Sequence, residues 1–190
     1  MNWPPFRSVR LETARLLLRP FVPEDAATLF AIYSDPRVIR YWSSPGWTGI
    51  EQAHALIDDD LDGMERNTHL RLGVVRWDTG ELIGQCVLYA FMRQCRRAEI
   101  GYLLHADHWK QGFMHEALTA LLDFAFGTLD LHRIEADVDP RNQASVRTME
   151  RLGFQKEGYL RERWIVAGEI SDTQFFGLLA REWNASRAQP

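Results

Sequence analysis

The segment between residues 69 and 104 constrains the fold most, because it holds three apolar, strand-like runs joined by short links. The runs are His69–Trp77, Leu82–Phe91 and Ala98–Leu104. Asp78–Glu81 has the composition of a hairpin turn, and Arg93–Arg97 is a short polar link. Three strands with such tight links predict an antiparallel meander.

Before the meander, the apolar residues recur with helical period. Pro23–Ser34 and a segment that begins near Thr48 predict two helices. Asp35-Pro36 ends the first helix, because a residue before proline disfavours the α region. Glu51 follows Thr48 by three residues, which predicts a capping box at the start of the second helix.

After the meander, helices and strands alternate. Gly112–Leu129 predicts a helix, and Ile134–Val138 alternates apolar and acidic residues, which predicts a half-polar strand. Asn142 is a good N-cap for a helix that ends at Leu152. The remaining segments predict a first strand and a last hairpin: Arg15–Phe21, Tyr159–Val166 and Ile170–Leu179. This order predicts a mixed α/β sheet in a single domain, residues 1–190.

Composition narrows the class of protein. At 190 residues, 46% apolar and 25% charged, the chain is typical of a globular domain, and its net charge of −4 disfavours a nucleic-acid binder. Cys86 and Cys95 form no disulfide framework, and the six histidines show no metal-ligand spacing. No apolar run approaches roughly 18 residues, and the N-terminus lacks the layout of a signal peptide. We therefore expect a cytoplasmic protein with no metal site and no direct contact with nucleic acid or membrane.

The segment His108–Ala117 carries the first signal of function. It follows the apolar run Ile100–Leu104 and places Gly112 at the start of an amphipathic helix. The first amides of a helix have no intrahelical partner, and the helix dipole favours an anion there. Gly112 permits a backbone conformation closed to other residues and a close approach to a phosphate. The sequence therefore predicts a phosphate-binding turn.

Four segments together resemble the GNAT superfamily of acetyl-CoA-dependent N-acetyltransferases. Within it, they are most similar to the RimJ/RimL-type branch that acetylates the N-terminal amines of ribosomal proteins. The segments are Arg10–Ala26, Ala98–Ala117, Asn142–Glu162, and Gly168 with Asp172. The resemblance implies an α/β (α+β) GNAT fold, a mixed, mostly antiparallel twisted sheet of about seven strands flanked by about four helices.

The resemblance also implies an acetyl-CoA site. The backbone of Tyr102, Leu103 and Leu104 would pair with the pantetheine arm as an added strand pairs with a sheet edge. Asn142 would hydrogen-bond the cofactor, and Ser145 would lie near the thioester sulfur. The amides that would surround the pyrophosphate are those of Lys110, Gln111, Gly112, Phe113, Met114 and His115.

The chain departs from the family's pattern at four positions. Trp109 and Lys110 replace the usual arginine or glutamine and the usual glycine of the turn. Met149 stands where some relatives have a general-acid tyrosine, and Trp164 stands where a catalytic carboxylate has been proposed in a close relative. The acid and the base therefore stay open.

Three carboxylates are candidates for the general base: Glu99, Asp137 and Glu162. Asp137 aligns with a base glutamate of another GNAT branch and lies on the polar side of its strand. The alternative for each of the three is a solvated or ion-paired surface acid. Ser145 has an alternative too, a polar residue in the first turn of its helix.

Two further groups have a functional and a structural interpretation. Trp42, Trp47 and Trp164 line an acceptor pocket or pack in the core. The acidic run Asp58–Asp60 with Asp62 is typical of a solvated helix face; beside an acceptor cleft, it would attract a cationic amine.

The predicted activity is direct transfer of an acetyl group from acetyl-CoA to a primary amine. The first acceptor to consider is a protein N-terminal α-amine, such as that of a ribosomal protein. Two alternatives stay open: an acetyltransferase of a small amine (a polyamine, amino acid or antibiotic), and a non-catalytic acyl-CoA-binding sensor. The expected assembly is a monomer or a homodimer.

Overall fold

The computed structural model describes residues 3–187, and within them the chain forms one eight-stranded sheet and six α-helices. The strand order is β1-β2-β3-β4-β5-β6-β8-β7, and every neighbouring pair is antiparallel except β5 and β6. The strands are β1 (Leu11–Glu12), β2 (Leu16–Arg19), β3 (Leu70–Arg76), β4 (Leu82–Met92), β5 (Arg97–Leu104), β6 (Arg133–Val138), β7 (Gln155–Val166) and β8 (Glu169–Leu179). The helices are α1 (Ala26–Ser34), α2 (Pro36–Ile39), α3 (Glu51–Glu65), α4 (Phe113–Gly127), α5 (Gln143–Arg151) and α6 (Ala180–Arg187).

The predicted mixed, mostly antiparallel sheet is confirmed, with one strand and two helices more than expected. The meander is β3, β4 and β5, each within about two residues of its predicted bounds. Leu72 pairs with Cys86, and Cys86 pairs with Tyr102, so the three strands share one register. The predicted helices after the meander are α4 and α5, and Asn142 caps α5 as expected.

Of two local predictions at helix ends, the end of the first helix before Pro36 was confirmed and the capping box at Thr48 was wrong. Pro36 ends α1 but also begins the short helix α2, because Asp35 Oδ1 accepts a hydrogen bond from the Arg37 N–H and caps that helix. The capping box at Thr48 does not form. Instead Gln52 Oε1 accepts from the Thr48 N–H at 2.8 Å, because the chain turns once more before α3 begins.

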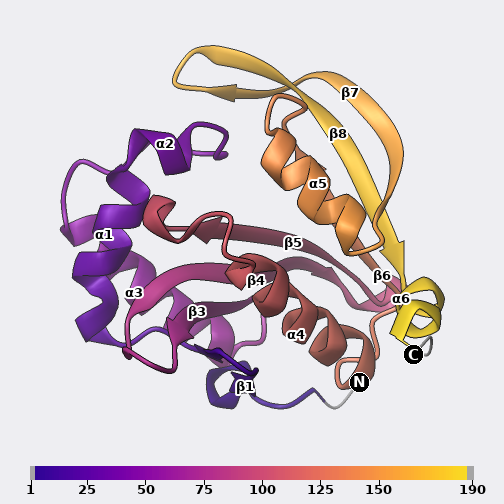
Figure 1. Cartoon of the computed structure of the whole chain (residues 1–190), viewed down its shortest axis with the longest axis horizontal. Helices are drawn as coiled ribbons and strands as arrows, with labels where there is room; N and C mark the ends of the chain where they lie inside the picture. Colours follow the sequence, from indigo (N-terminus) through magenta and orange to yellow (C-terminus); the bar gives the residue numbers. More distant parts are fainter. Residues whose placement is uncertain (1–2, 188–190) are drawn as a thin grey trace.

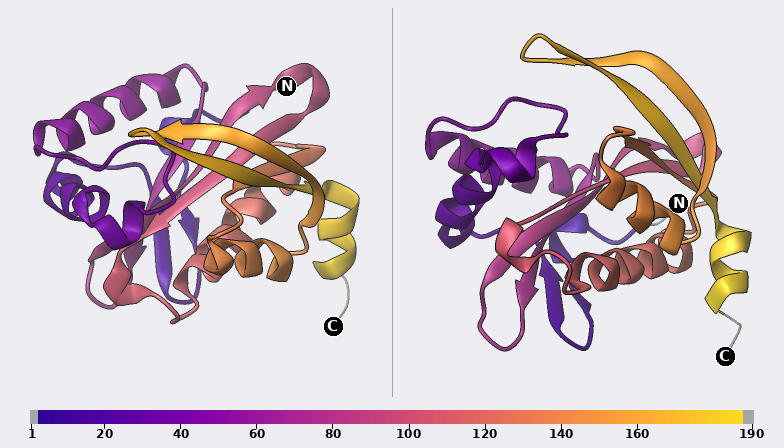
Figure 2. Two further views of the ribbon diagram at one scale, coloured as in Figure 1. Left: turned by 90° about the horizontal axis from the view of Figure 1, so that it is seen from above. Right: turned by 45° about the horizontal axis from the view of Figure 1, so that its top comes forward.

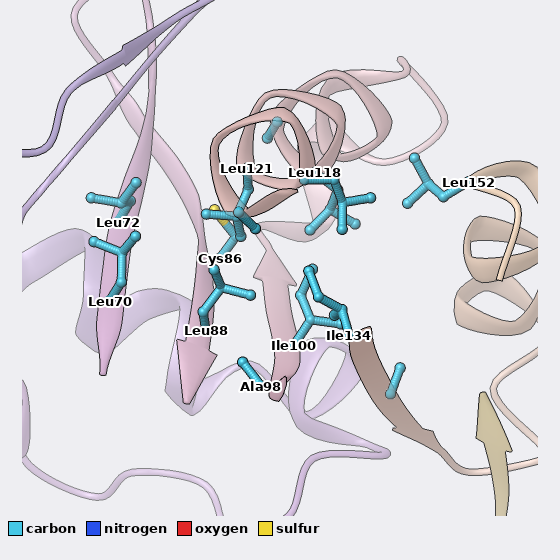
Figure 3. Close-up of a cluster of buried hydrophobic side chains, with 14 of the residues drawn as sticks. Leu70, Leu72, Cys86, Leu88, Ala98, Ile100, Leu118, Leu121, Ile134 and Leu152 are labelled. Carbon is cyan, nitrogen blue, oxygen red and sulfur yellow. The ribbon is translucent and has the colours of Figure 1, made fainter. Parts of the chain in front are cut away.

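Helices cover both faces of the sheet (Figure 1). On one face, Leu118 and Leu121 of α4 pack on the apolar side chains of β3 to β6 (Figure 3). On the other face, α1 and α3 enclose a second core that includes Leu29 and Ile57. Alternation along β5 sends Ile100 to the first core and Leu103 to the second.

The hairpin of β7 and β8 arches away from the sheet, over α5 and toward α2 (Figures 1 and 2). Its strands pair from Gln155–Gly177 to Val166–Glu169, with register shifts at Lys156–Gly158 and at Leu160–Trp164. Bulges bend and twist a strand pair. The hairpin therefore reaches across the molecule and helps to enclose the site described below.

Candidate active site

The sheet opens between β5 and β6. These strands pair only where Arg97–Glu99 lies beside Arg133–Glu135. Beyond this point, no strand within residues 3–187 pairs with Ile100–Leu104 on the β6 side. The backbone of Tyr102, Leu103 and Leu104 therefore borders an opening where an extended ligand could add as a strand would.

A small cavity of 100 Å³ occupies this opening, and we call it the slot. Tyr102, Asn142 and Ser145 line it, as do Val38 and Trp42 from the α2 side. The slot therefore brings together three of the residues that the sequence predicted for cofactor and thioester contacts. Its lining also includes Ile100 to Leu103 of β5 and Ala136 to Val138 of β6, the strand segments on the two sides of the opening.

The glycine turn follows β5 directly. Gly112 has φ +81° and is the N-cap of α4, and the Glu116 N–H donates to its carbonyl at 3.1 Å. The amides of Phe113, Met114 and His115 precede that first intrahelical bond, so the helix offers them no acceptor. The start of this 15-residue helix is a favourable place for an anion.

The two unusual residues of the turn are both accommodated. Lys110 adopts φ +63°, a conformation that glycine would reach at lower cost. Trp109 is 41% exposed, and its Nε1 donates to the Leu104 carbonyl at 2.9 Å, which ties the turn to the end of β5. The Lys110 ammonium also adds a positive charge beside the helix start.

Arg15 and Glu116 hold the turn against the link between β1 and β2. Arg15 Nη1 donates to the Gln111 carbonyl at 3.0 Å, and Arg15 Nε donates to Glu116 Oε2 at 2.6 Å. Glu116 Oε1 also accepts from Thr13 Oγ1 and from the Arg15 N–H. Partial burial favours the neutral Glu116 carboxyl, but these hydrogen bonds outweigh burial and lower its pKa.

A larger cavity of 560 Å³ adjoins the slot, and we call it the acceptor cavity. The two cavities share Tyr41, Trp42, Ile100, Gly101, Asp137 and Asp139. Four aromatic side chains line the acceptor cavity: Tyr41, Trp42, Tyr89 and Trp164. Six charged side chains also line it: Arg40, Arg71, Arg141, Asp137, Asp139 and Glu169.

Asp137 lies where the two cavities meet, and its side chain is only 11% exposed. Its Oδ1 accepts from Thr173 Oγ1 at 2.5 Å and from Trp164 Nε1 at 3.0 Å. Arg163 Nε lies 3.4 Å from Oδ2. Oδ2 has only this long contact with Arg163, so it could accept a further hydrogen bond from an amine.

The other predicted base candidates lie differently. Glu99 does not line either cavity and lies beside Tyr89, whose pKa is raised first by burial and then by the charges of Glu99 and Asp137. Glu162 is exposed in the β7 bulge with φ +54°, and its N–H donates to Asp172 Oδ1 at 2.8 Å. Asp137 is therefore the candidate that the fold brings to the junction.

The tip of the β7–β8 hairpin closes one side of the acceptor cavity. Arg40, just after α2, donates to Glu169 at 3.0 Å, and Arg141 donates to Glu169 at 2.7 Å. Both guanidinium groups lie over the Tyr41 ring, 5.3 and 5.7 Å from its centroid. The two arginines hold the pKa of Glu169 below its usual value. This network joins segments that are about 130 residues apart in sequence.

Two sequence interpretations are decided by the packing. Trp42 and Trp164 line the acceptor cavity, whereas Trp47 stacks on Tyr33 at 4.0 Å in the second core. The acidic run of α3 is not wholly solvated, because Asp60 is 2% exposed. Its Oδ1 lies 2.8 Å from His69 Nε2 and 3.2 Å from Arg71 Nε.

Some features of the site had no signal in the sequence. Thr173 contacts Asp137 because β8 pairs with β6, and Arg40, just after α2, contacts Glu169. Both contacts depend on the fold and have no local pattern in the sequence. Among the described residues, no three histidine, cysteine or acidic side chains gather as metal ligands would. Nor does that part of the chain contain a helix long and apolar enough to cross a membrane.

Two adjoining cavities, one along the open edge of β5 and one lined by aromatic side chains and a carboxylate, could hold two substrates side by side. Residues 15–155 match the family model described as the acetyltransferase (GNAT) domain. The chain belongs to this family and is an N-acetyltransferase, and members of the family use acetyl-CoA.

Individual relatives agree with this assignment. The chain is 39% identical over 177 residues to the uncharacterized N-acetyltransferase p20 of Bacillus licheniformis, covering 91% of this chain and 97% of that one. It is 28% identical over 190 residues to the [ribosomal protein uS5]-alanine N-acetyltransferase of Escherichia coli, covering 94% and 95%. The fold is also similar to a spermidine N-acetyltransferase from Vibrio cholerae solved with CoA and spermine, with a TM-score of 0.80, 23% identity, and 90% and 99% coverage.

Proposed function

We propose that the chain acetylates an α-amine at the N-terminus of a polypeptide, with acetyl-CoA as donor. The observation that carries the proposal is the position of Asp137, a little-exposed carboxylate at the junction of the two cavities. An α-amine has a pKa of about 7.7–8.0 and is partly neutral near pH 7. A carboxylate is therefore a sufficient base if it accepts, directly or through a water molecule, the one proton that the ammonium form must lose before attack.

The residues present fit acetyl-CoA. Gly112 and the following amides offer an anion site, and the open edge of β5 offers backbone groups to an extended amide arm. When bound, acetyl-CoA would supply its acetyl group as a thioester: a nitrogen–carbon bond forms to the amine, the carbon–sulfur bond breaks, and the thiolate leaves. Lys110 brings one positive charge to the turn, where Arg15 is paired with Glu116, and Asn142 and Ser145 border the slot.

The charges of the acceptor cavity favour a peptide over a polyamine. Each carboxylate of the cavity already has a guanidinium partner: Arg40 and Arg141 for Glu169, Arg141 for Asp139, and Arg163 for Asp137. A polyamine carries several ammonium groups and is best bound by unpaired carboxylates. Asp137 has the longest of these contacts, 3.4 Å, so it is the carboxylate most open to one ammonium group, beside aromatic walls that attract a single cation. The relative that acts on an alanine of ribosomal protein uS5 supports the same acceptor class.

The test is an acetylation assay on three acceptors: short peptides with a free N-terminus, spermidine, and free amino acids. We expect the peptides to give the highest kcat/KM. Asp137→Asn should lower that value by about 100-fold or more, because general-base assistance contributes roughly 10²–10⁴-fold. Its melting temperature should stay close to that of wild type, because asparagine can still accept from Thr173 and Trp164.

Asp130→Asn is the matched control. Asp130 lies outside both cavities, just before the start of β6, and pairs with Arg96 on the surface. It should keep wild-type turnover. Preference for spermidine would refute the peptide acceptor, and full activity of Asp137→Asn would exclude Asp137 as the base.

A further inference from the structure

The hydroxyl of Tyr102 is buried beside the slot and, within the part of the chain that the structure describes, it has no hydrogen-bond partner. The ring packs against the first core, on the α5 side of the sheet. Buried polar atoms are nearly always paired, because an unpaired one loses its bonds to water without replacement. This exception therefore calls for an explanation in terms of the site.

Two hydroxyl groups of α5 lie near Tyr102, those of Ser145 and Thr148. Both lower the pKa of Tyr102, but burial is the larger effect and raises that pKa to about 12. Thr148 Oγ1 already donates to the Ala144 carbonyl inside the helix at 2.9 Å. Ser145, in contrast, uses its backbone N–H to bond Asn142 Oδ1 at 3.1 Å, and it lines the slot.

The position where, by the resemblance, some relatives have a general-acid tyrosine gives no alternative donor. Met149 occupies it, has no proton to give, and is fully buried. Ser145 is therefore the α5 hydroxyl that lines the slot. A serine hydroxyl rotates freely unless a neighbour fixes it, and a rotating donor contributes less than a fixed one.

We propose that Tyr102 is a positioning residue that donates a hydrogen bond to Ser145 Oγ and thereby directs the Ser145 O–H at the sulfur of the bound cofactor. The position of the sulfur near Ser145 is what the family resemblance implies, so this inference rests on the proposed function. Tyr102 remains protonated throughout the working pH range, because its pKa is far above neutrality. It therefore orients Ser145 and does not itself supply the proton to a thiolate, whose ordinary pKa is about 8.5.

The test uses CoA itself and requires no acceptor. The thiolate of CoA absorbs in the ultraviolet where the thiol does not, so the pKa of the bound thiol can be titrated in the complex. A directed Ser145 O–H stabilises the thiolate and lowers that pKa. Tyr102→Phe and Ser145→Ala should each raise the pKa of the bound thiol by about 1 to 2, the size of one hydrogen bond to a charged group.

The double variant distinguishes positioning from an independent contact. If Tyr102 acts through Ser145, Tyr102→Phe should change nothing further in the Ser145→Ala background. Tyr102→Phe should keep a melting temperature close to that of wild type, because phenylalanine keeps the ring that packs against the first core. Tyr159→Phe is the control, since Tyr159 lies on the exposed hairpin, bonded to Asp172, and should leave the thiol pKa at the wild-type value.

Three results would overturn the inference: an unchanged thiol pKa in Tyr102→Phe, additive effects in the double variant, or no binding of CoA to the wild-type chain. Failure of the proposed function looks different. In that case no amine is acetylated, while CoA still binds and the two single variants still raise its thiol pKa.

Discussion

Replacement of Gly112 by alanine separates the two tasks of the glycine turn, which are its backbone conformation and its contact with a ligand. At φ +81°, a residue with a Cβ costs about 1–2 kcal/mol. The new Cβ would meet only Arg15 Nη2, at 3.4 Å, the end of a long side chain, so packing adds little to this cost. For a chain of this size each kcal/mol changes the melting temperature by about 2–4 °C. We therefore expect the unliganded variant to melt about 2–8 °C below wild type.

The effect of Gly112→Ala on cofactor binding is measured by thermal unfolding with and without acetyl-CoA. At about 100 times its Kd, a ligand stabilises a protein by roughly 2.7 kcal/mol, which is about 5–10 °C here. If the added methyl group removes about two charge-assisted hydrogen bonds, near 3 kcal/mol in all, binding weakens by about 100-fold. At the same concentration the stabilisation then falls to about 0.4 kcal/mol, or about 1–2 °C.

Gly80→Ala provides the matched control. Gly80 has φ +70° in the turn between β3 and β4, and an added Cβ there has no atom within 4 Å. It should melt lower by a similar amount while keeping the full shift with acetyl-CoA. A full shift in Gly112→Ala, or an equal loss of the shift in both variants, would refute the assignment of the turn to the phosphates.

Two further predictions concern single side chains. Burial raises the pKa of Cys86 to about 12, whereas Cys95 is exposed. A thiol reagent should therefore label one cysteine in the native chain and two after unfolding. Rapid labelling of Cys86 in the native chain would contradict its burial. The pKa of Glu116 lies below its usual value of 4.5, so its carboxylate stabilises the fold above that pH, and this stabilisation is lost as the pH falls through the lowered pKa. Glu116→Gln should therefore melt below wild type at pH 7 and approach it in acid, and a constant difference at all pH values would exclude the carboxylate as the cause.

Local patterns in the sequence determined much of the fold, because each depends on neighbouring residues. The short links of the meander permitted only adjacent strands, and β3, β4 and β5 lie close to their predicted bounds. The predicted cap at Asn142 forms through the Ser145 N–H, three residues away. The left-handed turn at Gly112 has an equally local cause, the absence of a Cβ.

Predictions failed or stayed open at residues whose surroundings depend on segments distant in the sequence. Asp60 was expected on a solvated helix face, but α3 packs with this position inward, where His69 and Arg71 pair with it. Glu162 alternates like any strand residue in the sequence, yet the β7 bulge leaves it exposed outside both cavities. Neither outcome can be inferred from spacing along the chain.

The sequence by itself therefore determined the order of elements, the glycine turn and the family resemblance, all of which reside in short segments. Only the tertiary structure decided that Asp137 meets Thr173 and Trp164, which come from a hairpin at least 27 residues further along the chain. It also decided that Tyr102 faces Ser145 and Thr148 of α5 with a hydroxyl that has no hydrogen-bond partner within residues 3–187. The physical reason is that strand register, bulges and packing bring these groups together, and these depend on contacts between segments that no local pattern specifies.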